Sequence, residues 1–274
     1  MRSFALECWD EGRLTVNGEF TEILRAHKLT TFDSLMHFSG GRVAKNLLRE
    51  RTTTQIELAG PDGARRAFFL KRHRPAPWKE YVKPLLRLAR PILGARHEWN
   101  AILEFHKVGI ETMIPVALGA RGRYSFLLTE SIVGCHKLSQ WMENGRRPRD
   151  TSEDRLTTSM VHRVAEVART MHAAGLHHQD FYLTHLMVPD EDPCRKLYVI
   201  DLGRACRRKR LGRRWIVKDL AQLNYSARSL SRKDRLRFLE GYLGRALRDS
   251  DRPFVRRIER KTEAIARHSR KHHL

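Results

Sequence analysis

Long apolar runs are missing from this sequence of 274 residues, although hydrophobic residues make up 41% of it. Its apolar segments are short and dispersed, and none approaches the roughly 20 consecutive apolar residues of a transmembrane helix. The N-terminal stretch MRSFALECWDEGRL carries acidic residues early and lacks the apolar core of a secretory signal. These absences predict a cytoplasmic globular protein, long enough for one large lobe or two small ones.

Cysteine is scarce, and its spacing excludes two common uses of this residue. Cys8, Cys135, Cys194 and Cys206 show no metal-binding spacing and suggest no disulfide framework. We therefore expect free thiols in a reducing compartment.

Acidic residues are few relative to basic ones: 31 against 53, which gives a net charge of +22. Such a charge attracts polyanions, namely nucleic acid, acidic lipid, phosphorylated glycan or an acidic partner protein. The excess is clustered in Arg204–Lys218 and Arg252–Lys271, each with eight lysines and arginines. Either cluster alone is compatible with a solvated face, but two favour an anionic ligand. No aromatic residues are interleaved with basic ones as in single-strand binding surfaces, so nucleic acid is not expected.

Two aspartates flank a predicted hairpin in the second half of the chain. Leu186–Val188 and Leu197–Ile200 are short apolar runs joined by a turn-rich insert, with Asp180 before the first and Asp201 after the second. Phosphoryl transfer uses one carboxylate to position and deprotonate the attacking hydroxyl and another to hold a metal ion. Single aspartates at such places also serve as turn or cap residues, but the pair in this order and spacing favours a kinase.

The residues around these aspartates follow the protein-kinase pattern with substitutions. His178-Gln179-Asp180 stands where kinases have His-Arg-Asp, His185 stands at the position of the metal-site asparagine, and Asp201-Leu202-Gly203 replaces Asp-Phe-Gly. Gln179 removes a charge that in many kinases pairs with a phosphorylated activation loop. We expect no such switch here.

The first half supplies the other two expected kinase residues. Thr52–Leu58 and Arg65–Lys71 are predicted strands around a Gly-Pro-Asp-Gly turn, and the second ends on Lys71. A predicted helix, His97–Lys107, follows and carries Glu98 in its first turn. Kinases need a lysine on the third strand to bind nucleotide phosphates and a helix glutamate to hold that lysine. Surface residues of both kinds are common, but their order ahead of the two aspartates favours a nucleotide-binding role for Lys71 and Glu98.

Two further predicted strands, Ile114–Leu118 and Tyr124–Glu130, lead to the segment Glu130-Ser131-Ile132. We expect it to be the hinge whose backbone meets adenine. A glycine-rich phosphate loop is not evident: Gly40-Gly41 precedes the first strand of the hairpin, but the pattern GxGxxG is absent. The sequence therefore does not establish how backbone amides would bind phosphate.

Trp78–Gly94 has apolar residues at helical spacing, with lysines and arginines largely on the other faces. Two interpretations remain open. It is either an ordinary helix packed on the small lobe or a basic amphipathic segment that contacts an anionic membrane or an acyl-bearing substrate.

The lobe boundary is predicted near Glu130, with an N-lobe at residues 1–130 and a C-lobe at 131–274. Residues 1–30 give few signals beyond a tight turn at Val16–Glu19. Thr31–Phe38 predicts a short helix. The second half is expected to be mainly helical, with Ser231 as a helix cap and a basic helical C-terminus that frays at its end. Its predicted helices are Leu156–Ala174, Leu220–Leu230 and Arg232–Leu247.

Taken together, these residues resemble the Kdo/WaaP family of lipopolysaccharide kinases, and within it the inner-core heptose kinases. The resemblance spans roughly residues 40–250 and includes the histidine at the metal-site position. Five segments carry it: FFLKRHR at 68–74, ILGARHEWNAI at 92–102, DFYLTH at 180–185, VIDLGRA at 199–205 and RRWIVKDLAQLNYSA at 213–227.

The resemblance implies an α+β, bilobal protein-kinase-like fold and ATP-dependent phosphorylation of a heptose hydroxyl of the lipopolysaccharide inner core. It implies that Lys71 binds ATP phosphates, that Asp180 is the base and that Asp201 is a metal ligand. Asp219 is implied to brace the catalytic loop. The basic run 204–218 is implied to meet acidic groups of the glycolipid, and the enzyme is expected to act peripherally at the inner face of the cytoplasmic membrane.

His185 leaves two alternatives for the metal site. In the first, His185 ligates the metal through a ring nitrogen, and Mn²⁺ then supports catalysis comparatively well. In the second, it lies outside the coordination shell and hydrogen-bonds the catalytic loop, while Asp201 holds Mg²⁺. We favour the second.

Other functions remain open at this level. A Kdo kinase or a protein kinase would use the same chemistry on another acceptor. A non-catalytic, kinase-like basic module that binds an acidic partner or nucleic acid is a third possibility, which the intact Lys71, Asp180 and Asp201 argue against.

Overall fold

The computed structural model describes residues 1–48, 51–75, 94–144 and 151–271. The chain divides into two compact units. The N-terminal unit comprises Arg2–Lys107 and Met113–Val133, and the C-terminal unit comprises Met1, Val108–Thr112 and Gly134–Leu274. Except for Gly94, the predicted amphipathic segment Trp78–Gly94 lies outside the described residues.

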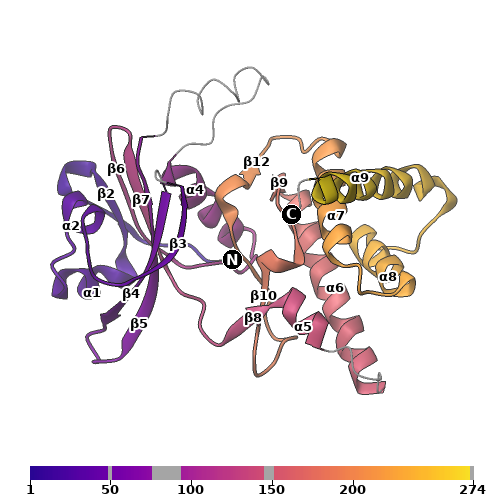
Figure 1. Cartoon of the computed structure of the whole chain (residues 1–274), viewed down its shortest axis with the longest axis horizontal. Helices are drawn as coiled ribbons and strands as arrows, with labels where there is room; N and C mark the ends of the chain where they lie inside the picture. The colour runs from indigo at the N-terminus through magenta and orange to yellow at the C-terminus, as the bar shows by residue number, and fades with distance from the viewer. Residues whose placement is uncertain (49–50, 76–93, 145–150, 272–274) are drawn as a thin grey trace. The chain divides into compact units, whose positions relative to one another are not determined.

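In the described part of the N-terminal unit, seven strands form one antiparallel sheet in the order β1-β2-β6-β7-β5-β4-β3 (Figure 1). Their bounds are β1 Leu6–Trp9, β2 Leu14–Asn17, β3 Arg42–Leu48, β4 Arg51–Ala59, β5 Arg65–His73, β6 Pro115–Arg121 and β7 Tyr124–Glu130. The predicted hairpin is confirmed as β4–β5, paired over its whole length. β5 lies between β4 and β7, so Lys71 is on a central strand.

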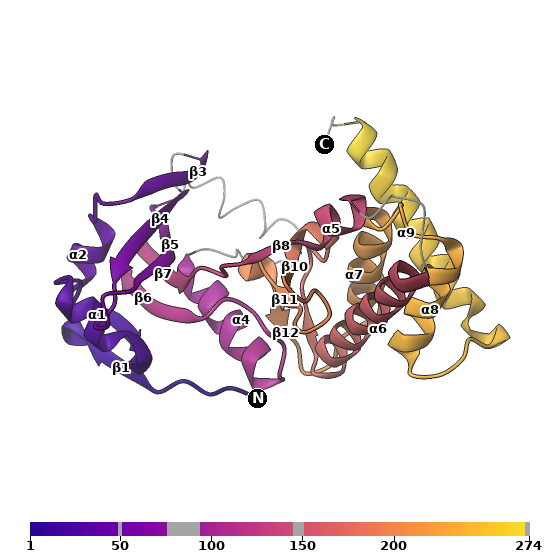
Figure 2. The same cartoon turned by 90° about the horizontal axis from the view of Figure 1, so that it is seen from below.

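Helices cover both faces of this sheet (Figure 2). Helices α1 (Thr21–Ala26) and α2 (Phe32–Met36) pack on one face, where alternate β5 residues such as Phe68 and Leu70 enter the core. Helix α4 (Ala95–Lys107) lies against the other face. Because successive side chains of a strand point to opposite faces, the residue after Leu70 points toward α4.

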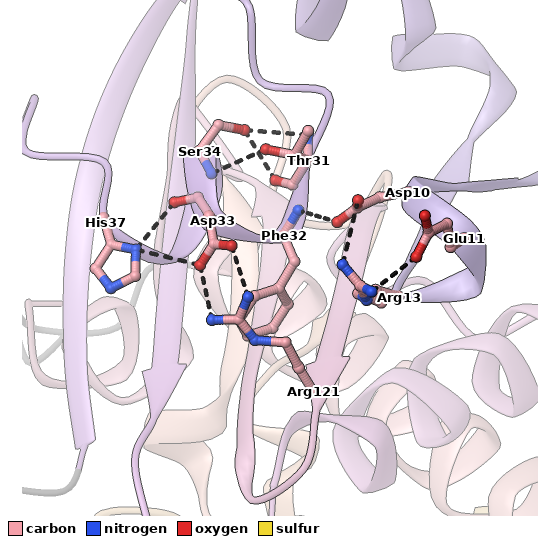
Figure 3. A network of polar contacts seen from close by, with 9 residues as sticks. All are labelled: Asp10, Glu11, Arg13, Thr31, Phe32, Asp33, Ser34, His37 and Arg121. Carbon is pink, nitrogen blue, oxygen red and sulfur yellow. Dashed lines mark hydrogen bonds and ion pairs between the residues drawn. The ribbon is translucent and has the colours of Figure 1, made fainter.

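Polar contacts fix α2 to its neighbours (Figure 3). Arg121, at the end of β6, donates two hydrogen bonds to Asp33, at 2.6 and 2.8 Å, and these hydrogen bonds hold the pKa of Asp33 below its usual value. Asp10 accepts a hydrogen bond of 2.7 Å from the first backbone amide of α2. Thr31 and Ser34 form a reciprocal capping box, which satisfies amides that a helix start leaves unpaired.

The described C-terminal unit is mainly helical. Helix α6 (Thr151–Ala173) packs against α8 (Arg232–Leu243), and α7 (Arg213–Ser226) packs against α9 (Arg252–Lys271) (Figure 1). Its remaining elements are α5 Leu138–Asn144, β8 Cys135–Lys137, β9 Leu176–His177, β10 Leu186–Pro189, β11 Tyr198–Val199 and β12 Cys206–Arg207. The predicted hairpin around the insert is confirmed, with β10 and β11 antiparallel.

Short 3₁₀ turns complete the described elements. They are Asp10–Gly12, Gly18–Phe20, Leu183–His185, Leu202–Arg204 and Asp249–Asp251. All four cysteines are free, as expected. No helix in the described residues is both long and apolar enough to cross a membrane.

Several predicted boundaries are wrong. Val16 belongs to β2, because it pairs with Ala117 of β6, and the turn follows at Gly18–Phe20. Helix α7 begins and ends earlier than the predicted Leu220–Leu230. Helix α8 ends at Leu243 because Gly244 adopts a left-handed conformation (φ +68°) that terminates helices.

The predicted basic, helical C-terminal segment is present as α9, which continues to Lys271, the last residue that the structure describes. Ile258 of α9 is buried, and Asn224 of α7 donates a hydrogen bond of 3.1 Å to Thr262 of α9. These contacts along α7 stabilise a helix whose exposed face is strongly basic. Ser231 caps α8 as predicted, accepting a hydrogen bond from the Asp234 amide.

Candidate functional site

An ion pair joins Lys71 of β5 to Glu98 of α4 in the N-terminal unit. The Lys71 Nζ donates to the Glu98 Oε1 at 2.6 Å. The Glu98 side chain is only 8% exposed and that of Lys71 is 26% exposed, so the pair is well shielded from water. Gly94 (φ +81°) leads into α4, and the next amide, that of Ala95, donates to Ser125 of β7 at 3.0 Å. The start of α4 is thereby fixed to the sheet that carries Lys71.

Glu130 ends β7 in the same unit. Its carboxylate accepts two hydrogen bonds from Arg66, at 2.9 and 2.6 Å, and its amide donates to the Ile114 carbonyl at 2.9 Å. The structure therefore gives Glu130 defined partners within its own unit. A nucleotide contact by this residue stays a prediction. Residues 49–50, which connect β3 and β4, lie outside the described part of the chain.

In the C-terminal unit, the loop from His178 to His185 is held by one face of α7. Asp219 accepts hydrogen bonds from the backbone amides of His178 and Gln179, at 2.7 and 2.9 Å, so the prediction that it braces this loop is confirmed. Burial raises the pKa of Asp219, but hydrogen bonds from His172 and the backbone outweigh this, and the net pKa lies below its usual value. Asp219 is thus held as a buried carboxylate.

Two more residues of the same α7 face hold the loop, and sequence reasoning missed both. Gln222 accepts from the Phe181 amide at 3.1 Å and donates to the Gln179 carbonyl at 2.7 Å. Ser226 accepts from the Leu183 amide at 2.9 Å. Positions 219, 222 and 226 follow the i, i+3, i+7 spacing of one helix face. Three polar residues at that spacing, among apolar ones, were the available signal.

His178 ties this loop to the strand that precedes Asp201. Its Nε2 donates to the Ile200 carbonyl at 3.0 Å, and its Nδ1 accepts from the Asp180 amide at 3.2 Å. A ring that donates through one nitrogen and accepts through the other is neutral. Burial of the ring lowers its pKa, in agreement with this assignment.

Asp180 has a cationic neighbour in Arg204. The Arg204 Nη1 lies 3.3 Å from both carboxylate oxygens of Asp180. Solvent reaches this pair from the arginine side, because the Arg204 side chain is 66% exposed while that of Asp180 is 27% exposed. Gln179, in a left-handed conformation (φ +71°), donates through its side chain to the Arg204 carbonyl at 2.7 Å.

Asp201 and His185 face each other in the same unit. The His185 Nε2 lies 3.6 Å from the Asp201 Oδ2, and the His185 Nδ1 donates to the Asp180 carbonyl at 2.7 Å. In the neutral ring, the lone pair is then on Nε2, the nitrogen that faces Asp201. Asp201 is itself left-handed (φ +60°), a conformation that costs energy in a non-glycine residue and often occurs at functional sites.

This donor set fits a divalent cation, because a carboxylate oxygen and an imidazole nitrogen lie close enough to share one. The hydrogen bond from His185 to the Asp180 carbonyl is compatible with both predicted roles, because ligating histidines commonly donate their other ring nitrogen to a carbonyl and a histidine outside the coordination shell would support the loop through the same contact. The described residues contain no cluster of three or more His, Cys, Asp or Glu side chains suited to a metal. Phosphate oxygens and water would therefore complete the coordination, as is usual for Mg²⁺.

An apolar cavity of about 320 Å³ lies among the helices of the C-terminal unit. Its lining comes from α5 to α9, the 3₁₀ turn at Leu183 and the residues after α7, and includes Met142, Met160, Val164, Leu220, Phe238 and Ile258. Its lining is mainly apolar, unlike the loop from His178 to His185, although α7 contributes residues to both. No pattern in the sequence indicated this cavity.

The six predicted site residues are thus divided between the units. Lys71 and Glu98 are brought together in one, where Glu130 instead holds Arg66. Asp180, His185 and Asp201 are brought together in the other.

Known proteins resemble this chain in sequence and in fold. The model of the "Lipopolysaccharide kinase (Kdo/WaaP) family" matches residues 41–242. Lipopolysaccharide core heptose(I) kinase WaaP of Pseudomonas aeruginosa is 37% identical over 240 residues, which are 82% of this chain and 86% of that protein. The same-named protein of Escherichia coli K12 is 36% identical over 216 residues, 73% of this chain and 77% of that protein.

A solved structure of WaaP in complex with acyl carrier protein has the same fold, with a TM-score of 0.70 and 32% identity over 92% of this chain and 98% of that one. The predicted α+β, protein-kinase-like fold is confirmed. With a family match over most of its length and relatives of this identity, the chain belongs to the lipopolysaccharide kinase (Kdo/WaaP) family and is a kinase.

Proposed function

We propose that this kinase transfers the γ-phosphoryl group of ATP to a heptose hydroxyl of the lipopolysaccharide inner core. Membership of a kinase family implies the use of ATP. The observation that carries the choice of acceptor is the 36–37% identity to heptose(I) kinases over most of the chain. It favours a heptose over Kdo or a protein as the acceptor.

Asp180 is the proposed general base. It accepts the proton of the attacking hydroxyl while hydrogen bonds from the loop amides to side chains of α7 keep its loop in place. In the N-terminal unit, which we propose binds the nucleotide, Lys71 holds phosphate oxygens and Glu98 orients the lysine. Asp201, with His185 beside it, would hold Mg²⁺, which supplies charge neutralisation on the phosphate oxygens.

The direct test is transfer to a defined acceptor. Core lipopolysaccharide from a strain that lacks its heptose kinase is incubated with the purified protein and ATP, and the glycan is fragmented by mass spectrometry. We expect one added phosphoryl group on a heptose. Phosphate on Kdo, or none on the glycan in the presence of a phosphorylated protein, would contradict the proposal. Asp180→Asn serves as the inactive control.

We also propose that the enzyme binds an acidic protein partner. The net charge of +22, the basic face of α9 and the complex of a relative with acyl carrier protein support a carrier protein, whose acyl chain would suit the apolar cavity. Gel filtration with acylated and unacylated carrier protein at low and high salt tests this.

The matched variants compare the two units. We expect the complex to be weakened by the double variant Arg256→Gln, Arg260→Gln in α9. The control is the double variant Lys28→Gln, Arg65→Gln in the N-terminal unit, which loses the same charge and should bind normally. Equal binding by both variants would exclude α9 as the surface.

Peripheral association with an anionic membrane is a further part of the proposal, supported by the same excess of charge. Each basic residue near anionic lipid contributes about 1 kcal/mol, and salt screens this attraction. Flotation with anionic liposomes should show binding at low salt that is lost at high salt. Absence of binding at low salt would leave the protein without a membrane-associated state.

A further inference from the structure

The loop that carries the base lacks a cation of its own. The four residues between Asp180 and His185 are Phe-Tyr-Leu-Thr, without lysine or arginine. Phosphoryl transfer spreads negative charge over the three equatorial oxygens of the moving group, and positioned cations stabilise that charge. A cation that reaches this group must come from another part of the unit.

Arg204 is placed to provide it. Its guanidinium lies 3.3 Å from both oxygens of Asp180, near the long limit for such contacts, and both side chains are partly exposed. Ion pairs of this kind contribute little to stability, because solvent screens them and the side chains lose entropy. The guanidinium can therefore leave Asp180 for a more highly charged anion at little cost.

The backbone of Arg204, in contrast, is held firmly. Gln179 donates to its carbonyl at 2.7 Å, and the next amide, that of Ala205, donates to the Leu202 carbonyl at 3.0 Å. Cys206 pairs with His177 in the two-stranded sheet β12–β9. The Arg204 side chain can thus move while its backbone stays fixed to the loop that carries Asp180.

The transferring phosphoryl group is expected to lie close enough to Asp180 to accept hydrogen bonds from the Arg204 guanidinium. A hydroxyl that donates its proton to Asp180 lies about 3 Å from the carboxylate, and the phosphorus that it attacks lies about 3–3.5 Å further. The phosphoryl oxygens therefore come within reach of a side chain that already touches Asp180. A guanidinium also matches a phosphoryl group geometrically, since it can bind two oxygens at once.

We propose that Arg204 is a catalytic residue that leaves Asp180 to bind the transferring phosphoryl group. As the hydroxyl oxygen bonds to the γ-phosphorus, the bond from that phosphorus to the bridging oxygen breaks, and its electron pair stays on ADP. The hydroxyl proton passes to Asp180. Departure of Arg204 frees the carboxylate lone pairs that accept this proton, so binding of the phosphoryl group and release of the base are one event.

Lys218 supports an electropositive surrounding for this step. It lies on α7 immediately before Asp219 and is partly buried. Burial lowers its pKa, although the carboxylates of Asp180 and Asp219 act in the opposite direction.

The test separates nucleotide binding from transfer. Affinities for ADP and for a non-hydrolysable ATP analogue are measured by calorimetry with Mg²⁺ and without acceptor, for the wild type, Arg204→Gln and Arg204→Lys. If Arg204 binds the γ-phosphoryl group, Arg204→Gln lowers the preference for the ATP analogue over ADP by about tenfold or more, with ADP affinity unchanged. Arg204→Lys keeps the positive charge but lacks the paired N–H donors of the guanidinium, so it retains part of the preference for the ATP analogue. Lys233→Gln, an equal loss of charge on an exposed site of α8, leaves the preference intact.

Turnover is then measured on the lipopolysaccharide core acceptor. Arg204→Gln should reduce kcat by about 10²-fold or more, with an unchanged melting temperature. Reduced turnover with a normal preference for the ATP analogue would mean that Arg204 only orients Asp180, and would overturn the proposal. Lost preference with full turnover would overturn it as well. The acceptor rests on the proposed function: if wild type does not phosphorylate this acceptor, that function fails, and the nucleotide measurement alone decides the role of Arg204.

Discussion

Two ion pairs in this kinase are built in opposite ways. Lys71–Glu98 is short, at 2.6 Å, and largely withdrawn from water between a central strand and a helix. Asp180–Arg204 is longer, at 3.3 Å, and its arginine side chain is mostly exposed to solvent. The first keeps one arrangement because breaking it would leave a buried carboxylate unpaired. The second can exchange partners. With the proposed roles, Lys71 is held in place before any ligand binds, whereas Asp180 becomes available as a base only when a ligand draws Arg204 away.

The largest effect on turnover is expected from Asp180→Asn, in the Asp180–Arg204 pair. The amide cannot accept the proton, so turnover should fall about 10²- to 10⁴-fold, while ATP affinity and melting temperature stay close to wild type. Steady-state kinetics with nucleotide titration measure both. Full activity in the variant would remove Asp180 from the role of base.

Lys71→Ala should affect both nucleotide use and stability. Loss of a charge-assisted phosphate contact raises the KM for ATP more than that for the acceptor. The unpaired Glu98 destabilises the fold by about 1–3 kcal/mol, which denaturant unfolding measures. The double variant Lys71→Ala, Glu98→Gln should recover much of the stability and none of the ATP use. A stability loss as small as that of Arg204→Gln would mean that the two pairs do not differ as described.

Asp219→Asn tests the hydrogen bonds that hold the loop carrying Asp180. Its carboxylate accepts two backbone amides, and an asparagine amide group cannot replace both acceptors, so a loss of about 2–3 kcal/mol is expected. Because the folded-state pKa of Asp219 lies below its unfolded value, its contribution is full above the unfolded pKa and is lost as pH falls through the folded pKa. The stability gap between wild type and variant should therefore narrow in acid. A gap that is constant with pH would argue against a charged Asp219.

The smallest effect is expected from His185→Asn. If His185 lies outside the coordination shell, the variant keeps activity with Mg²⁺ within about tenfold, and the ratio of Mn²⁺ to Mg²⁺ activity is unchanged. Metal titrations of both proteins measure this. A clear Mn²⁺ preference in the wild type that disappears in the variant would make the imidazole a ligand.

Local patterns predicted those parts of the fold whose partners are near in sequence. The β4–β5 and β10–β11 hairpins and α4 follow from alternation, turn residues and helical spacing. The β1–β2 hairpin is an exception, because its two strands are neighbours in sequence and were still missed. Each has only four residues, too few to show a clear alternation, and β2 pairs on its other side with β6, about 100 residues away along the chain. Sequence also gave no sign that Arg204 meets Asp180, since that contact depends on how two loops are placed.

The predicted site residues were found through their types and order, but their supports were not. Asp219 was expected because of the family resemblance. Gln222 and Ser226 were missed because their spacing with Asp219 marks a polar helix face but does not indicate which loop that face contacts. Roles that depend on a nucleotide, such as that of Glu130, remain predictions.

Helix α7 is contacted on two sides: the catalytic loop rests on Asp219, Gln222 and Ser226, while Thr262 of α9 bonds to Asn224 and to the Ala221 carbonyl. The family match ends at residue 242, before α9 begins. Domain boundaries taken from that match would therefore cut away a helix on which the catalytic loop indirectly depends. Shortened expression products that stop there would be expected to lose activity with every recognised catalytic side chain still present.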